Sequence, residues 1–210
     1  MNLFDLYLPL ASSQHSGEVG GVPFLIQPNF PLLLANTAFD FREEAHEQLA
    51  ARFAQAGVPI SYTLPENATQ PTSFGLQPST VFELCTSVPS VRAQWTEHVP
   101  WSEGWTIAKI LTEAYGMPEW RMPLSSPVGK FLQYPDHSAF IAYLYADSVG
   151  AVLATKAAAI LMGVTPSRLG NGVGAGLIGR IYPKPFVRLA GTEAEFPGEV
   201  VQRYVRYERT

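Results

Sequence analysis

Apolar residues are concentrated in three neighbouring runs in the second half of the chain, at 139–146, 149–155 and 157–164. Polar residues such as Asp147, Ser148 and Lys156 separate these runs, which are rich in small and β-branched side chains. The pattern predicts three consecutive strands joined by tight turns. Pro166 ends the third strand, because proline cannot donate a hydrogen bond to a strand ladder.

A glycine-rich loop follows the third strand and leads into a predicted helix. Glycines stand at positions 170, 172 and 174, and apolar residues then recur at helical spacing at Val173, Leu177 and Ile181. The spacing predicts a helix that starts near Gly172 and ends before Pro183.

The first part of the chain predicts a strand–helix–strand unit over residues 31–64. Asp40 and Glu43 resemble the two ends of a capping box, and an apolar stripe through Leu49 and Phe53 predicts a helix that ends at Gly57. The predicted strands of this part are Leu3–Leu10, Val22–Ile26, Leu32–Ala35, Ile60–Leu64 and Val81–Thr86.

A second helix is predicted between Ser102 and Gly116, followed by an irregular segment over Pro118–Pro127. The last strands are predicted at Phe186–Ala190 and Val200–Tyr207. Strands that alternate with helices indicate the α/β class. We expect residues 1–97 to form an N-terminal βα region that continues the sheet of a second domain, residues 98–210.

Composition excludes several classes of function. The net charge of −4 gives no basic surface for nucleic acid, and no apolar run is long enough to cross a membrane. The single cysteine, Cys85, and four scattered histidines offer no metal-ligand spacing, so we expect no metal. No secretory signal is visible, and a cytoplasmic location is expected.

The glycine loop is suited to binding an anion. Glycine lacks Cβ, so backbone N–H groups can approach an anion closely, and a helix N-terminus adds unpaired donors and a positive dipole end. A loop that merely packs a helix against a strand remains an alternative. A dinucleotide-binding loop is another, because Gly174–Gly179 matches G-x-G-x-x-G and Glu193 and Glu195 lie about 20 residues further on.

Strand, loop and helix together resemble the acyl-coenzyme A signature of the general N-acetyltransferase (GNAT) superfamily over roughly residues 98–182. Val164-Thr165-Pro166 matches the strand end, and Gly172-Val173-Gly174 matches the final glycine pair. The usual glutamine or arginine position holds Leu169, one place after Arg168. The resemblance implies a mixed, mostly antiparallel central sheet flanked by helices, to which the pattern of residues 31–64 adds a βαβ-containing N-terminal extension. The residues that it implies for binding acetyl-coenzyme A or another acyl-coenzyme A are Met162, Gly163, Val164, Arg168, Leu169, Gly170, Asn171, Gly172, Val173 and Gly174.

Catalytic side chains are harder to find. In several members of this superfamily a glutamate on the strand before the loop acts as general base, but Ala157–Leu161 contains no carboxylate. Glu113 and Glu119 are the acids nearest to the site in the family layout. A tyrosine usually protonates the leaving thiolate, and Tyr182, Tyr204 and Tyr207 are candidates here. Each of these side chains is also typical of ordinary surface or packing positions.

The resemblance implies an acyl-coenzyme A dependent N-acyltransferase that acts on a small-molecule or peptide amine. A degenerate, non-catalytic protein that binds acyl-coenzyme A or a partner is the alternative, and homodimerisation stays open. The aromatic residues Trp95, Trp101, Trp105, Tyr115 and Trp120 indicate either packed core or the wall of an acceptor pocket.

Overall fold

The computed structural model describes residues 2–8, 16–28, 33–89 and 96–209. Its helices are α1 (Leu3–Tyr7), α2 (His46–Gln55), α3 (Gly104–Ala114), α4 (Arg121–Phe131) and α5 (Val173–Ile181). Its strands are β1 (Ser16–Val19), β2 (Val22–Leu25), β3 (Thr37–Ala38), β4 (Tyr62–Pro65), β5 (Gln77–Ser87), β6 (Thr96–His98), β7 (Ser138–Leu144), β8 (Asp147–Ala154), β9 (Ala159–Val164), β10 (Phe186–Leu189) and β11 (Gly198–Glu208). The expected α/β class with mixed, mostly antiparallel strands flanked by helices is confirmed.

The chain packs as two compact units. The first comprises residues 1–82 together with 202–210, and the second comprises residues 83–201. Strands β5 and β11 each contribute residues to both units. The expected division near residue 97, with residues 1–97 continuing the sheet of residues 98–210, stays a prediction.

The first unit contains the expected βαβ extension. Its strands follow the order β1-β2-β3-β4-β11, and β3 pairs parallel with β4 through Ala38 and Tyr62. Helix α2 connects these two strands and buries Leu49 and Phe53 completely. Phe24 of β2 contacts the Phe53 ring, so one apolar core lies between the helix and the strands.

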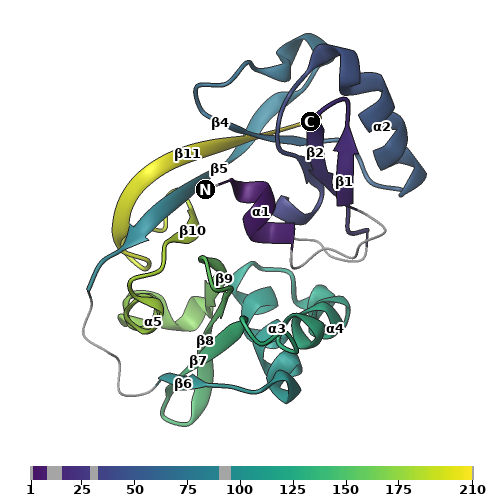
Figure 1. Cartoon of the computed structure of the whole chain (residues 1–210). Helices are drawn as coiled ribbons and strands as arrows, with labels where there is room; N and C mark the ends of the chain where they lie inside the picture. Colours follow the sequence, from purple (N-terminus) through teal and green to yellow (C-terminus); the bar gives the residue numbers. More distant parts are fainter. Residues whose placement is uncertain (1, 9–15, 29–32, 90–95, 210) are drawn as a thin grey trace. The chain divides into compact units, whose positions relative to one another are not determined.

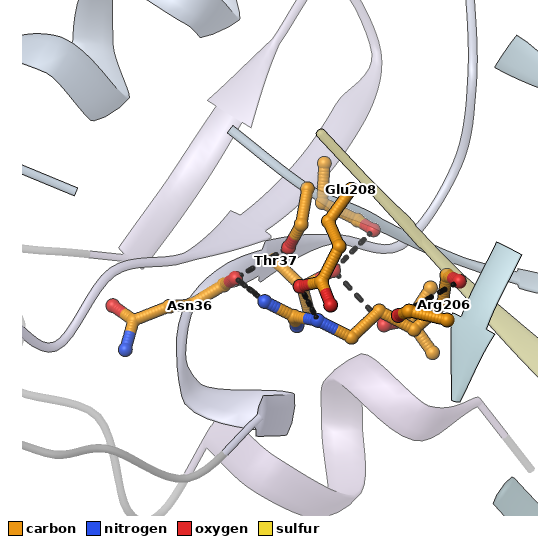
Figure 2. A network of polar contacts seen from close by, with 8 residues as sticks. Asn36, Thr37, Arg206 and Glu208 are labelled. Carbon is orange, nitrogen blue, oxygen red and sulfur yellow. Dashed lines mark hydrogen bonds and ion pairs between the residues drawn. The ribbon is translucent and has the colours of Figure 1, made fainter. Parts of the chain in front are cut away.

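A buried arginine joins β11 to the residue just before β3 in the first unit. Figure 2 shows the Arg206 guanidinium between the Asn36 carbonyl, at 3.3 Å, and the Glu208 carboxylate, at 2.9 Å. Beside it, the hydroxyls of Thr37 and Thr63 form a buried hydrogen bond of 2.9 Å. Buried polar groups are therefore paired here rather than left without partners.

The predicted strand at Leu3–Leu10 is wrong for Leu3–Tyr7, which forms α1; residues 9 and 10 lie outside the described part of the chain. The Asn2 side chain accepts a hydrogen bond from Phe4 N at 3.1 Å and thereby caps the helix. The predicted strand at Leu32–Ala35 is also wrong, because Leu33–Ala35 forms a 3₁₀ turn and residue 32 is not described.

The predicted capping box does not form. Asp40 Oδ1 accepts a hydrogen bond from the adjacent Phe41 N, and α2 begins only at His46. A 3₁₀ turn, Glu43–Ala45, precedes the helix.

In the second unit, helices cover both faces of the sheet. Its strands follow the order β5-β10-β9-β8-β7-β6, with β6 to β9 antiparallel to one another. A Cβ on Gly150 would touch Val173 of α5, whereas a Cβ on Gly163, which pairs with Ala151, would touch Leu111 of α3. Because neighbouring strand residues point to opposite faces, α3 and α5 lie on opposite sides of the sheet, as Figure 1 also shows.

The irregular segment predicted over Pro118–Pro127 is wrong, since most of it belongs to α4. The helix contains Pro127 and is held by packing: Leu124, Val128 and Phe131 are buried. Gly104 of α3 approaches the α4 backbone so closely that a Cβ would lie 3.1 Å from Ser125 O. Tertiary contact therefore outweighs the local cost of the proline.

Among the described residues, no helix is both long enough and apolar enough to cross a bilayer. The described residues also contain no cluster of three or more His, Cys, Asp or Glu side chains arranged to hold a metal ion. The predictions of no metal and of a cytoplasmic location are not tested further by these observations.

Candidate functional site

Strands β9 and β10 pair only where they begin. Their parallel register is limited to Phe186 opposite Ala159, and Ala159 N donates to Pro185 O at 2.9 Å. Beyond this point, a cavity of about 320 Å³ lies between the strands. Its lining residues are Ala114, Tyr115, Met162, Gly163, Val164, Leu169, Gly170, Val187, Arg188, Leu189, Gly191, Thr192, Ala194, Glu195 and Phe196.

The backbone of β9 turns hydrogen-bonding groups toward this cavity. Thr165 N donates to Val149 O of the neighbouring strand, which makes this a hydrogen-bonded pair of the antiparallel ladder. Such pairs alternate along a ladder, so the backbone of Gly163 also faces β8. The N–H and C=O groups of Met162 and Val164 therefore point to the opposite side, where the cavity lies.

Tyr115 supports this assignment. Its hydroxyl donates to Met162 O at 2.8 Å from the end of α3. Burial of the hydroxyl raises the pKa of Tyr115, although the residue as a whole is 36% exposed. The phenol therefore stays protonated at neutral pH, and it is a hydrogen-bond donor inside the cavity.

The glycine loop forms as the sequence predicts. Pro166–Arg168 makes one 3₁₀ turn after β9, and Gly170 and Gly172 then adopt left-handed φ angles of 79° and 73°. Gly172 is the N-cap of α5. Non-glycine residues reach this backbone conformation only with strain, so the two glycines set the course of the loop.

The backbone donors of this loop bind a carboxylate of the same chain. Gly170 N donates to Glu195 Oε2 at 2.8 Å, and Gly174 N donates to Glu195 Oε1 at 2.6 Å. Glu195 is only 7% exposed and lies between β10 and β11. The loop is thus an anion-binding site in this structure, and its anion is Glu195.

A buried ion pair positions the segment that carries Glu195. Arg188 of β10 binds Glu83 of β5 through Nε and Nη2, each at 2.8 Å from Oε2. The remaining nitrogen, Nη1, donates to the carbonyl of Phe196 at 2.5 Å. The residue next to Glu195 is therefore fixed by a charged group closed to solvent.

The structure brings half of the predicted acyl-coenzyme A residues together. Those that line the cavity are Met162, Gly163, Val164, Leu169 and Gly170. Those in the loop or the first turn of α5 that do not line it are Arg168, Asn171, Gly172, Val173 and Gly174. Arg168 lies 3.6 Å from Asp147 in a partly exposed ion pair. For all ten residues, the role in binding acyl-coenzyme A stays a prediction.

The predicted catalytic side chains do not line the cavity. Glu113 forms a 2.9 Å ion pair with Arg121 of α4. Tyr182 is half-exposed after α5, and Tyr204 belongs to the first unit. Tyr207 lies in that unit as well, and Glu119 is exposed.

Sequence reasoning missed Tyr115 as a hydroxyl donor and Glu195 as a partner of the loop. Tyr115 appeared only in the aromatic group, of which Trp101 and Trp105 are exposed and Trp95 lies outside the described residues. Neither role can be predicted from the neighbouring residues in the sequence, because both contacts join segments far apart in the chain.

No family model matches the sequence, and no curated protein matches it. Several solved structures are similar to this structure. A GCN5-related N-acetyltransferase from Kribbella flavida has a TM-score of 0.67 and 14% identity, covering 99% of this chain and 94% of its own. A functionally unknown conserved protein from Staphylococcus epidermidis has a TM-score of 0.60 and 12% identity, covering 92% and 93%. An acetyltransferase of the GNAT family from Colwellia psychrerythraea has a TM-score of 0.52 and 10% identity, covering 92% and 82%. At these identities the likeness concerns the fold: the chain has the GNAT fold, as expected.

Proposed function

From the GNAT fold, we propose that this protein is an acyl-coenzyme A dependent N-acyltransferase for a small-molecule or peptide amine. The observation that carries the proposal is the cavity between the separated strands β9 and β10. The Met162 and Val164 backbone groups that face it are suited to the two amides of pantetheine. The glycine loop lies at one end of the same cavity through Leu169 and Gly170.

In the proposed reaction, a neutral amine attacks the thioester carbonyl. A C–N bond forms and the C–S bond breaks, the amine releases a proton, and the thiolate takes one up. Tyr115 is our candidate for the proton donor, because it lines the cavity and its hydroxyl, which donates to Met162 O, can turn from that carbonyl to the thiolate. Water then restores the phenol proton.

No residue is assigned as general base. Glu195 is the one carboxylate among the described lining residues, and two backbone N–H groups already bind it. We therefore propose that the amine enters neutral, or loses its proton to water. Much of the rate then comes from holding the amine and the thioester together.

A non-catalytic acyl-coenzyme A binding protein is the second candidate. The observation that favours it is the same Glu195 carboxylate, which holds the loop donors that a diphosphate would need. Thiol release from acetyl-coenzyme A in the presence of a panel of amines distinguishes the two candidates, since only an enzyme produces amine-dependent thiol.

Calorimetry with acetyl-coenzyme A and coenzyme A tests the proposal. We expect saturable binding, and thermal stabilisation of about 2.7 kcal/mol at a ligand concentration of 100 times Kd. Leu169→Asp places a negative charge at the exposed side of the cavity and should weaken binding at least tenfold. Val201→Asp, at an exposed valine of β11 that does not line the cavity, is the matched control. Absence of binding by every acyl-coenzyme A tried contradicts the proposal.

A further inference from the structure

The anion site of the glycine loop is filled from within the chain. The two oxygens of Glu195 each accept one backbone hydrogen bond, from Gly170 on one side of the loop and from Gly174 at the start of α5. These are donors that point into the region where the loop meets the cavity, and Glu195 and Gly170 both line that cavity. A bound diphosphate would need the same N–H groups.

The Glu195 carboxylate is held there by its backbone as well as by its side chain. A Cβ on Gly174 would collide with the carbonyl oxygen of Glu195 and with the Phe196 ring, so this segment packs directly on the first turn of α5. Glu195 N and Phe196 N both donate to Thr192 O, at 3.1 and 2.9 Å, which folds the segment into a compact turn.

Arg188 strengthens this arrangement from the opposite side. It holds the Phe196 carbonyl while it is paired with Glu83 in the interior. Its positive charge is therefore committed to Glu83 and to the segment itself. Arg188 also lines the cavity, so it forms a fixed part of the wall next to the Glu195 carboxylate.

Two anions cannot share these donors without strong repulsion. A carboxylate in the loop and a diphosphate beside it would place like charges within a few ångströms in a partly buried site, which disfavours the charged complex. Either the carboxylate leaves its N–H partners or the diphosphate stays outside.

We infer that Glu195 is a specificity-determining residue that competes with the diphosphate of the acyl donor for the glycine loop. The inference rests on the proposed function for the identity of the donor. It implies that the wild-type protein gains little affinity from the diphosphate. Most of its binding then comes from the pantetheine and acyl parts that enter the cavity.

The first test uses inorganic pyrophosphate as the probe, with backbone amide NMR signals of Gly170 and Gly174 as the readout. Glu195→Ala should bind pyrophosphate at these amides at concentrations at least tenfold below those that the wild-type protein needs. Glu195→Gln, which keeps the size of the side chain and removes its charge, should shift in the same direction. Glu193→Gln removes a charge from the same segment, at a side chain that accepts a hydrogen bond from Gly191 N, and should behave as wild type.

The inference is overturned if wild type and both Glu195 variants bind pyrophosphate equally. It is also overturned if neither Glu195 variant binds pyrophosphate. The variants' ordered Gly174 signal shows that α5 has formed in the proteins compared.

The second test compares acetyl-coenzyme A with S-acetylpantetheine, which has no phosphate. Glu195→Ala should bind acetyl-coenzyme A at least tenfold more tightly than wild type and S-acetylpantetheine less than threefold more tightly. Unchanged or weaker acetyl-coenzyme A binding by Glu195→Ala overturns the inference. A third outcome is that pyrophosphate binds at the loop of Glu195→Ala, but neither acetyl-coenzyme A nor S-acetylpantetheine binds to wild type or to the variant. In that case the proposed function fails, while the competition at the loop is supported.

Discussion

Arg188 and Glu83 form an ion pair, 2.8 Å between Nη2 and Oε2, in which both side chains are at most 3% exposed. They belong to β10 and β5, which are neighbours in the sheet of the second unit. Burial of two charges is costly, and pairing offsets the cost only while both partners remain. The pair therefore fixes Arg188, which lines the cavity, to the neighbouring strand β5.

Glu83→Gln or Arg188→Met should lower the free energy of unfolding by about 3–5 kcal/mol, because each removes the oppositely charged partner of a buried charge. Removing both charges together, in Glu83→Gln/Arg188→Met, should cost less than the sum of the single changes. Asp147→Asn removes the partner of Arg168 in an exposed pair and should cost about 1 kcal/mol or less. Urea denaturation measures all four values, and additive single changes would show that the buried pair is not coupled.

The glycines of the loop should differ in their tolerance of alanine. Gly172→Ala meets no atom within 4 Å and should cost about 1–2 kcal/mol, from its left-handed φ alone. Gly174→Ala should cost clearly more, since its Cβ collides with the Glu195 carbonyl and the Phe196 ring. A Gly174→Val variant is therefore not expected to stay fully folded. Thermal unfolding of both alanine variants checks the order, and equal melting temperatures would contradict it.

Tyr115→Phe should lower kcat by about 10²-fold if the phenol protonates the leaving thiolate, a loss typical of a general acid. Coenzyme A affinity should change less than about threefold, because the ring and its packing remain. Tyr182→Phe is the control, since that side chain does not line the cavity, and it should keep kcat within about twofold. A Tyr115→Phe enzyme with unchanged kcat would remove the phenol from the reaction.

The pH profile of kcat/KM should follow the acceptor amine and not a carboxylate of the protein. We expect the rate to rise with pH until the amine is neutral, because the described cavity residues offer no unoccupied base. Glu113→Gln should cost less than about tenfold, or 1.4 kcal/mol, since Glu113 binds Arg121 outside the cavity. Acceptors of different pKa should shift the profile accordingly; a thousandfold loss in Glu113→Gln would instead identify it as the base.

His46 should make stability depend on pH. Burial lowers the pKa of His46 below its ordinary value, and its ring lies against Phe74 and within 3.0 Å of the Tyr62 hydroxyl. The unfolded chain then binds the proton at a higher pH than the folded chain does. The stabilising contribution is therefore complete above the unfolded pKa of about 6.5 and is lost as the pH falls below it. Urea denaturation at several pH values between 5 and 8 gives the free energy of unfolding as a function of pH. This free energy should change less with pH for His46→Gln than for wild type, and His98→Gln, at an exposed histidine, is the control.

The sequence predicts well where local pattern and tertiary environment agree. The runs that became β7, β8 and β9 are apolar because they are buried between two layers of helices, and the loop glycines are required by positive φ. In α4, by contrast, Pro127 gives a local signal against a helix. That signal is overridden by Val128 and Phe131, which pack in the core.

The site is only partly visible in the sequence for a different reason. The glycine loop is contiguous, so its shape can be read from neighbouring residues. Tyr115 meets Met162 across 47 positions, and Glu195 meets Gly174 across 21, so their roles depend on how separate segments fold together. The burial of Leu3, Leu6 and Tyr7 likewise follows helical spacing, but this apolar run is too short for its spacing to distinguish a helix from a strand.

The discontinuous first unit has a consequence for how the chain folds during synthesis. Tyr204 to Tyr207 of β11 pair with β4, so this unit lacks one strand until those residues have left the ribosome. Residues 83–201 are made earlier and already hold the cavity, the loop and Glu195. The order of synthesis therefore leaves the β4 edge of the first unit unpaired until residues 202–210 are available, whereas every residue of the second unit precedes them in the chain.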